Sequence, residues 1–327
     1  MGVGGFGYAT VMVAATRTRT GTVAVVAHRE KSLGGGLGEL RAALADAGHA
    51  DPVWYEVDKS RKAPKKARKA MRQGARLVFV WGGDGMVQRT LDALAGSGVA
   101  VAILPAGTAN LLATNLGIPR DLAAAVRIGL HGARRALDLG RVNGEHFAVM
   151  AGAGFDGAMM RDAGRGLKDR LGSLAYVWTA VRHVGDSARR VRIRVDGDTW
   201  FTGDASCVLF GNVGTATGGL RLFDDARPDD GWLDVGVATA QGAVQWARTL
   251  GQVATGRSER SPFVRTTRAR KVDVRFGSPT TYELDGGDRD PVSRLKVRLV
   301  PRAIEVCVPD QSDDSAGGDS AGSQPMP

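Results

Sequence analysis

The sequence has few cysteines, few aromatic residues and no long apolar run. Only Cys207 and Cys307 occur in 327 residues, and aromatic side chains make up 6% of the chain. The two cysteines lack the spacing of a metal site, so we interpret both as reduced core residues. No apolar run approaches the roughly 20 residues of a membrane-spanning helix, so a chain that crosses a membrane is not expected. The five histidines show no metal-ligand spacing.

The N-terminal segment also lacks the order of a secretory signal. Its apolar part has no basic residues before it, and its arginines follow instead. We therefore expect a cytoplasmic protein.

Basic residues are in clear excess. The chain has 44 Lys and Arg against 34 Asp and Glu, a formal net charge of +10. Such a charge favours polyanionic partners: nucleic acid, nucleotide phosphates or an anionic bilayer. Charge alone does not choose among them.

The densest basic stretch is residues 59–73, "KSRKAPKKARKAMRQ", with eight Lys or Arg and no acid. Nucleic-acid binding is not expected, because no aromatic residues are interleaved and no reader motif is present. A solvated helix face is one interpretation. The other is a peripheral contact with anionic headgroups on the inner face of the plasma membrane, where each basic residue contributes about 1 kcal/mol.

The hydrophobic pattern divides the chain into two domains. Up to residue 142, short apolar runs alternate with helical stretches, which predicts an open, mainly parallel α/β domain whose first ~20 residues are disordered. The expected strands are 22–30, 53–57, 76–81 and 99–105, and the expected helices are 37–48, 63–74, 86–96 and 108–116.

Residues 143–309 have a different texture. Val-rich alternation predicts strands at 145–155, 191–213, 231–240, 264–276, 280–285 and 294–308, with helices at 158–187 and 242–256. We expect a β-rich, sandwich-like domain whose last strand packs back on the first domain. Residues 310–327 are Ser, Gly, Asp and Pro with almost no apolar residue, which predicts a disordered tail.

Two glycine-containing loops follow consecutive strands of the first domain. The stretch "WGGDG" brings Gly82, Gly83, Asp84 and Gly85 to the carboxyl end of a strand, where ligands of open α/β sheets lie. On spacing alone, Asp84 either holds a phosphate and its metal or caps the following helix.

The second loop, "ILPAGTANLLATNLGIP", contains Gly107, Thr108 and Asn110. Alone it reads as a Pro-Gly turn with a threonine cap. Two such loops from neighbouring parallel strands converge on one crevice, which is the layout of a nucleotide site.

Five segments in order resemble the bacterial members of the diacylglycerol kinase catalytic family, which is related to sphingosine, ceramide and, more distantly, NAD kinases. They span residues 79–287: "GGDG", "LPAGTANLLATNLGIP", "FAVMAGAGFDGAMM", "GNVGTATGGLRLFDDARPDDGWLDV" and "YELDGG". The resemblance implies ATP-dependent transfer of the γ-phosphoryl group to a lipid hydroxyl, with the nucleotide between an α/β and a β-rich domain. Diacylglycerol giving phosphatidic acid is the expected reaction.

The resemblance also implies roles for particular residues. Asp84 would organise ATP with Mg²⁺, while the glycines, Thr108 and Asn110 would hold the nucleotide. Asp285, in the family's "DGE" element, would be the general base, although Asp-Gly is also a common hairpin turn. Asp230, helped by the carbonyls of Arg227 and Trp232, would bind a structural Mg²⁺, or form a plain turn.

Three departures from the family pattern stand out. Met86 replaces a threonine after "GGDG", Gly287 replaces the glutamate of "DGE", and "VAHREKSLGGG" lacks the Asn-Pro near the first strand. An NAD kinase-like or sphingoid kinase, and a degenerate nucleotide- or lipid-binding regulator, therefore stay open. So do the acceptor lipid, a homodimer, and a lipid pocket lined by the helical stripe of 167–184.

Overall fold

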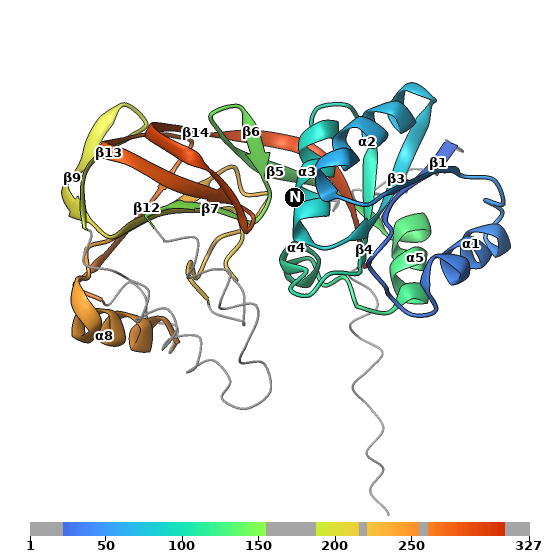
Figure 1. Ribbon diagram of the computed structural model, residues 1–327, viewed down its shortest axis with the longest axis horizontal. Coiled ribbons are helices and arrows are strands. Elements are labelled where there is room, and N and C mark those ends of the chain that lie inside the picture. Colours follow the sequence, from blue (N-terminus) through green and yellow to red (C-terminus); the bar gives the residue numbers. More distant parts are fainter. Residues whose placement is uncertain (1–21, 155–187, 216–220, 255–260, 311–327) are drawn as a thin grey trace, which may run out of the picture.

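The computed structural model describes residues 22–154, 188–215, 221–254 and 261–310. The predictions for the N-terminal segment, for the stripe at 167–184 and for residues 311–327 lie outside this part of the chain. Element labels follow Figure 1.

The first domain is an α/β layer structure around a parallel sheet. The neighbouring strands β4, β3, β1 and β2 all run parallel. Every residue of β4 is buried, and so are nearly all of β1 and β3, as expected for strands covered on both faces. Their bounds are Thr22–His28 (β1), Val53–Val57 (β2), Ala75–Gly82 (β3) and Ala100–Pro105 (β4).

Helices cover both faces of this sheet. In Figure 1, α2 and α3 lie above it, and α1 and α5 lie below it. Helix α2 turns Ala63, Ala67 and Ala70 inward at helical spacing, so its lysines and arginines face outward. The bounds are Gly36–Asp46 (α1), Ser60–Lys62 (η1), Ala63–Arg72 (α2), Asp84–Leu94 (α3), Leu111–Asn115 (α4) and Leu122–His131 (α5).

The second domain packs two antiparallel layers against each other. One layer runs β12-β11-β10-β7, and the other contains β9, β8, β13 and β14. Apolar side chains of both layers form one core, in which Phe210 and Val235 meet Val274 and Leu295. The bounds are Glu145–Phe147 (β6), Met150–Ala153 (β7), Arg189–Val195 (β8), Asp198–Ala205 (β9), Cys207–Gly211 (β10), Leu233–Ala238 (β11), Gly242–Ala254 (α8), Val264–Ala269 (β12) and Lys271–Leu284 (β13).

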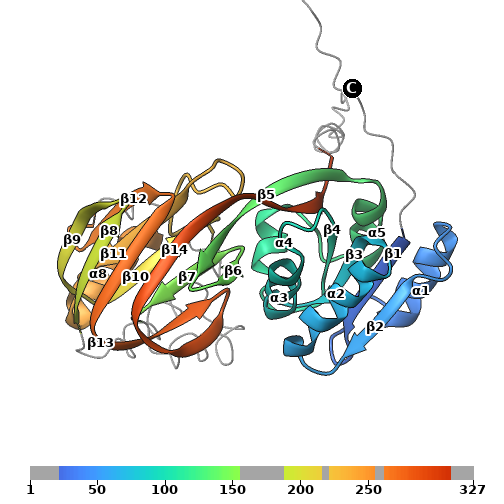
Figure 2. The same cartoon turned by 90° about the horizontal axis from the view of Figure 1, so that it is seen from above.

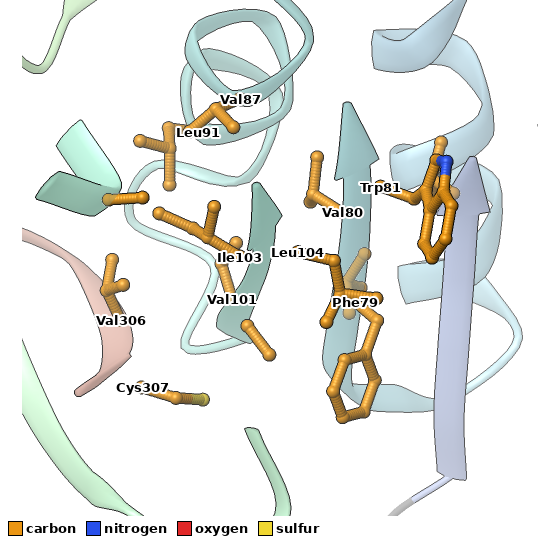
Figure 3. Packing of buried hydrophobic residues seen from close by; sticks show 14 of the residues in the cluster. Phe79, Val80, Trp81, Val87, Leu91, Val101, Ile103, Leu104, Val306 and Cys307 are labelled. Carbon is orange, nitrogen blue, oxygen red and sulfur yellow. The ribbon is translucent and has the colours of Figure 1, made fainter. Parts of the chain in front are cut away.

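Two long strands join the domains. Strand β14, Gly287–Val308, starts as the partner of β13 and ends beside β4 of the first domain. Strand β5, Ala133–Val142, runs antiparallel to it. Figure 2 shows both strands crossing from one domain to the other. Figure 3 shows the result inside the first core, where Val306 and Cys307 of β14 lie in the same cluster as Val101 and Ile103 of β4.

The α/β and β-rich architecture confirms the predicted fold class. Both cysteines are free and buried, as expected, and burial raises the pKa of Cys207 to about 12. Helix α5 and strand β5 were absent from the sequence-based prediction, which assigned no element to residues 117–142. No helix of the described residues is long and apolar enough to span a membrane.

Candidate active site

The two glycine loops of the first domain touch backbone to backbone. A Cβ atom added to Gly107 would lie 2.3 Å from the Cα atom of Gly83, a distance that no real contact tolerates. The N–H of Ala106 also donates to the carbonyl of Gly82 at 3.1 Å. The glycines at 83 and 107 are therefore required by the approach of one loop to the other. The two loops therefore lie side by side in the structure, as the sequence predicts.

Asn110 shapes the second loop from within. Its backbone is left-handed, with φ 51°, and its side chain is buried. The side-chain Oδ1 accepts from the N–H of Gly107 at 2.9 Å, and Nδ2 donates to the carbonyls of Pro105 and Gly107. The side-chain amide of Asn110 thus forms its hydrogen bonds within the loop. Its predicted role in fixing a nucleotide would therefore be indirect, through the shape of the loop.

Asp84 ties the first loop to the second. It is the first residue of α3, yet its carboxylate does not cap that helix. Oδ2 accepts from the N–H of Asn110 at 2.9 Å, and Oδ1 accepts from the N–H of Leu111 at 2.5 Å, both at the start of α4. Burial raises the pKa of Asp84, and these backbone donors oppose the rise. The N–H groups of Asp84 itself and of Leu112 also act on this carboxylate, so four backbone donors surround it.

The remaining residues of these loops differ in exposure. Gly85 and Thr108 are exposed, which leaves the threonine hydroxyl accessible to a ligand. The first N–H groups of α3 have no partner within the helix and point with its positive end toward any anion placed there. Met86, in contrast, is buried beneath Gly82, where an added Cβ would come within 2.6 Å of the methionine side chain. Gly82 is needed for this packing.

Asp285 sits in a two-residue turn between β13 and β14. The turn has φ 47° at Asp285 and 78° at Gly286, which is the hairpin geometry that Asp-Gly favours. The side chain does more than form the turn, because it is buried and accepts three backbone hydrogen bonds. The N–H groups of Ala148, Val149 and Met150 donate to it at 2.8–2.9 Å.

The two predicted catalytic carboxylates lie close enough to repel each other. Burial is the main cause that raises the pKa of Asp285 to about 6, the three donors oppose it, and the charge of Asp84 adds to the rise. Asp285 belongs to the second domain and Asp84 to the first. The fold therefore brings the two carboxylates near enough for their charges to interact, although only the family resemblance, and not the converging loops, had linked Asp285 to this site.

The link between the domains at this site runs through α3. Gln88, one turn after Asp84, donates to the carbonyl of His146 at 2.6 Å, and Asp92 accepts from the N–H of His146 at 2.9 Å. The donors of Asp285 begin two residues later, at Ala148. Helix α3 thus carries Asp84 itself, and through β6 it also positions the backbone N–H groups that bind Asp285.

Glu283 is a site residue that the sequence analysis did not single out. It precedes Asp285 by two positions in β13 and is 7% exposed. Burial raises its pKa to about 7, with Asp288 and Asp285 adding negative charge. The alternation of side chains along β13 could have identified it. Tyr282 and Leu284 pack in the core of the second domain, so Glu283 lies on the opposite face of the strand.

The loop predicted to bind a structural Mg²⁺ has another cation. Arg268 donates to Oδ2 of Asp230 in a close ion pair, and the N–H of Trp232 donates to Oδ1 at 3.0 Å. Within the described residues, no group of three or more His, Cys, Asp or Glu has the arrangement of a metal site. A carboxylate already facing a guanidinium and an N–H does not fit a Mg²⁺ ligand. The assignment of Asp230, Arg227 and Trp232 stays a prediction that the geometry does not favour.

Asp138 is the residue that organises this loop, and the sequence analysis missed it. It is buried in β5, and its carboxylate accepts from the N–H of Gly231 at 2.8 Å and from that of Arg302 at 2.7 Å. Its partners are distant in sequence, so no local pattern reports them.

Comparison with known proteins gives a consistent result. Residues 31–142 match the family model of the diacylglycerol kinase catalytic domain, and residues 149–308 match that of the YegS C-terminal NAD kinase beta sandwich-like domain. A Pseudomonas aeruginosa protein named "Probable lipid kinase YegS-like" is 35% identical over 283 residues, which are 83% of this chain and 90% of that protein. A Mycobacterium tuberculosis diacylglycerol kinase is 29% identical over 73% of this chain and 79% of its own.

Solved structures share the fold. A diacylglycerol kinase from Bacillus anthracis superposes with a TM-score of 0.66 at 18% identity, over 89% of this chain and 98% of its own. An NAD kinase from Archaeoglobus fulgidus in complex with ATP has a TM-score of 0.51 at 10% identity, over 91% and 98%.

Proposed function

Because the chain belongs to the family of diacylglycerol kinases and YegS-like lipid kinases, we propose that it transfers the γ-phosphoryl group of ATP to a lipid hydroxyl, with diacylglycerol as the first acceptor to test. Family membership supports a phosphotransferase. The observation that supports the finer proposal is that Asp84 and Asp285, from different domains, lie near enough for the charge of Asp84 to add to the raised pKa of Asp285.

The paired loops provide the nucleotide side of this site. ATP enters as its magnesium complex, with phosphates against the N-terminus of α3 and the exposed hydroxyl of Thr108. Asp84, fixed by the N–H groups of Asn110 and Leu111, would place its negative charge where it helps to hold the magnesium complex of ATP. Phosphoryl transfer needs mainly positioning and neutralisation of charge, which a braced loop pair provides.

Asp285 is suited to act as the general base. With a pKa of about 6 it is mostly ionised at neutral pH and still close enough to that pH to hold a proton. In the proposed step the acceptor hydroxyl gives its proton to Asp285, and its oxygen forms a bond to the γ-phosphorus. The bond from that phosphorus to the β,γ-bridging oxygen breaks, and ADP leaves. Three backbone donors hold the carboxylate in place throughout.

No step is assigned to a structural Mg²⁺ at Asp230, because Arg268 already balances that charge. The loop is instead fastened by Asp138 and by the ion pair of Arg135 with Asp229 at 2.8 Å.

We also propose that α2 meets an anionic membrane surface. Lys65, Arg68, Lys69 and Arg72 are exposed on the helix, and of these only Arg68 acts on an acidic side chain of the described residues, that of Asp92. Peripheral binding through such a helix is consistent with a lipid acceptor, since each basic residue near an anionic surface contributes about 1 kcal/mol.

The test is transfer of γ-labelled phosphate from ATP with Mg²⁺ onto lipids in mixed micelles. The panel contains diacylglycerol, a sphingoid base, ceramide and phosphatidylglycerol, with NAD as a soluble acceptor. We expect a labelled lipid with the wild type and at least about 100-fold slower labelling with Asp285→Asn. Label on NAD alone would replace this proposal with an NAD kinase activity. Binding of ATP without transfer to any acceptor would identify a regulator.

A further inference from the structure

In the second domain, the layer that contains β9, β8, β13 and β14 has an outer face covered with basic residues. Strands β8 and β13, the middle of β14 and the end of β5 alternate buried apolar residues with exposed ones. The exposed residues form what we call the basic sheet face, which consists of Arg190, Arg192, Arg194, Lys271, Arg275, Arg294, Lys296, Arg298 and Arg141, with Asp273 among them. Nine Lys or Arg and one Asp give these described residues a formal charge of +8, against +10 for the entire chain.

The strand register places like charges opposite each other. Arg275 lies across from Arg192 on one side and from Arg294 on the other. In the next row, Asp273 lies opposite Arg194 and Lys296, and in the row beyond it Lys271 is opposite Arg298, which in turn is opposite Arg141. Like charges in directly opposite positions destabilise a sheet. A cost repeated over adjacent strands suggests that the charges serve a partner.

The molecule itself neutralises little of this face. Asp273 pairs with Arg294 and lies 3.7 Å from Arg275, and Asp204 on the edge strand β9 is opposite Arg190. Arg194 donates to the carbonyl of Gly197. Within the part of the chain that the structure describes, the side chains of Lys271, Lys296 and Arg298 form no hydrogen bond, although Lys296 lies opposite Asp273 and helps to lower the pKa of its carboxyl. A hollow of about 270 Å³ lies among the basic residues, lined by these three with Arg194, Arg294 and Asp273.

This face and α2 are on the same side of the molecule. The apolar residues of β8 and β13, such as Ile193 and Val274, point down to the other layer of the sandwich, so the arginines point up. Figure 1 shows β13 and β14 along the upper edge of the second domain and α2 along the upper edge of the first. Two basic surfaces from different domains therefore face the same direction.

We infer that the basic sheet face docks on an anionic lipid bilayer, with the phosphates of the headgroups lying between its arginines and lysines. The inference rests on the proposed lipid kinase function and adds a second contact to that of α2. Its charges spread over several strands, which suits an extended anionic surface. The described residues of this face include no aromatic side chain, so it lacks the stacking platform of a single-strand nucleic-acid binder. Arginine is also well suited to phosphate oxygens, because its planar fork donates two parallel hydrogen bonds.

The test compares two triple variants that lose the same charge. The first, Lys271→Gln, Lys296→Gln and Arg298→Gln, removes the three side chains that form no hydrogen bond, so it breaks no ion pair of the described residues. The control, Arg76→Gln, Arg120→Gln and Arg127→Gln, removes exposed charges of the first domain away from this face. Binding is measured by co-sedimentation with vesicles of phosphatidylglycerol and phosphatidylcholine, and with phosphatidylcholine alone.

We expect the sheet variant to bind the anionic vesicles about 100-fold more weakly than the wild type, and the control to change far less. Equal weakening in both triples would reduce the effect to net charge and overturn the inference. Unchanged vesicle binding, with loss of binding to inorganic phosphate or to a single-stranded oligonucleotide instead, would overturn it in favour of those ligands.

A second readout separates this inference from the proposed function. Phosphorylation of diacylglycerol dispersed in neutral detergent micelles should be the same for the sheet variant and the wild type, because no charged surface is present. If the wild type phosphorylates no lipid but the sheet variant still loses vesicle binding, docking stands and the kinase proposal fails. If vesicle binding is unchanged while micelle activity is normal, the docking inference alone is wrong.

Discussion

The two carboxylates of the site are held by the same kind of donor in different surroundings. Asp84 accepts two backbone N–H groups and is half-buried, whereas Asp285 accepts three and is almost wholly buried. Both have a raised pKa with burial as the main cause, but only Asp285 reaches about 6. Backbone N–H donors can therefore hold a carboxylate that joins two loops, as at Asp84, or one whose pKa lies nearer to neutral pH, as at Asp285. The difference depends on how far the carboxylate is buried away from water.

The largest effect should come from Asp285→Asn. The amide cannot take a proton from the acceptor, and its NH₂ group would face backbone N–H donors. We expect kcat to fall about 10²- to 10⁴-fold, the range for loss of a general base. The wild-type rate should rise with pH through about 6, because the base must be ionised. Steady-state assays in mixed micelles measure both. Asp290→Asn, an exposed neighbour, should leave the rate unchanged, and an equal loss there would refute the assignment.

Asp84→Asn tests the other side of the comparison. One of its two acceptors becomes a donor, so either Asn110 or Leu111 loses its bond and the start of α4 moves. We expect kcat/KM for ATP to fall by about 10- to 100-fold, which corresponds to the roughly 1.5–3 kcal/mol of a hydrogen bond to a charged group. Calorimetry with a non-hydrolysable ATP analogue separates nucleotide affinity from the rate. If affinity and rate both match the wild type, Asp84 has no role in the site.

The parts of this comparison that the sequence predicts are local. Glycine after a buried strand predicts a tight loop, and two such loops on parallel neighbours predict their convergence, as Gly83 and Gly107 show. Alternation predicted most strands of the second domain. The sequence could not place Asp84 on the N–H groups of another loop, or give Asp285 its three donors, because those partners lie 26 or more residues away.

Two further differences between the sequence-based expectations and the structure have a similar cause. Helix α5 and strand β5 were missed because their partners are distant: β5 pairs with β14, and α5 packs on β4 and β14. The Mg²⁺ loop was expected from its resemblance to the family's loop, which says nothing of Arg268, the residue of strand β12 that faces Asp230. A local sequence pattern indicates which residues of a helix or strand are buried, but it does not indicate which residues of distant segments pack or pair with them.

Gly107→Ala tests the contact between the two loops that Asp84 joins. The new Cβ would press on the backbone of Gly83 and the side chain of Asn110, and neither can give way cheaply. We expect a loss of about 3 kcal/mol in the free energy of unfolding, at the upper end for overpacking, together with weaker ATP binding. Gly85→Ala is the matched control for stability, since an added Cβ there meets open space and its φ is not positive. Urea denaturation of both decides the point, and equal stability would mean that the loops are not in contact.

The smallest effect concerns the pH dependence contributed by Glu283, beside Asp285. Its folded pKa of about 7 lies above the ordinary 4.5, so its contribution to stability is present at low pH and is lost as the pH rises through 7. Glu283→Gln lacks this loss. Relative to the wild type, the variant should therefore gain about 2 kcal/mol of unfolding free energy between pH 5 and pH 8. Glu145→Gln should show almost no change over this range, because the Arg289 side chain lowers the pKa of Glu145 and that group is already ionised above pH 5 in both the folded and unfolded states. Denaturant titrations at the two pH values measure both slopes, and parallel behaviour of the two variants would show that Glu283 is not buried as an acid.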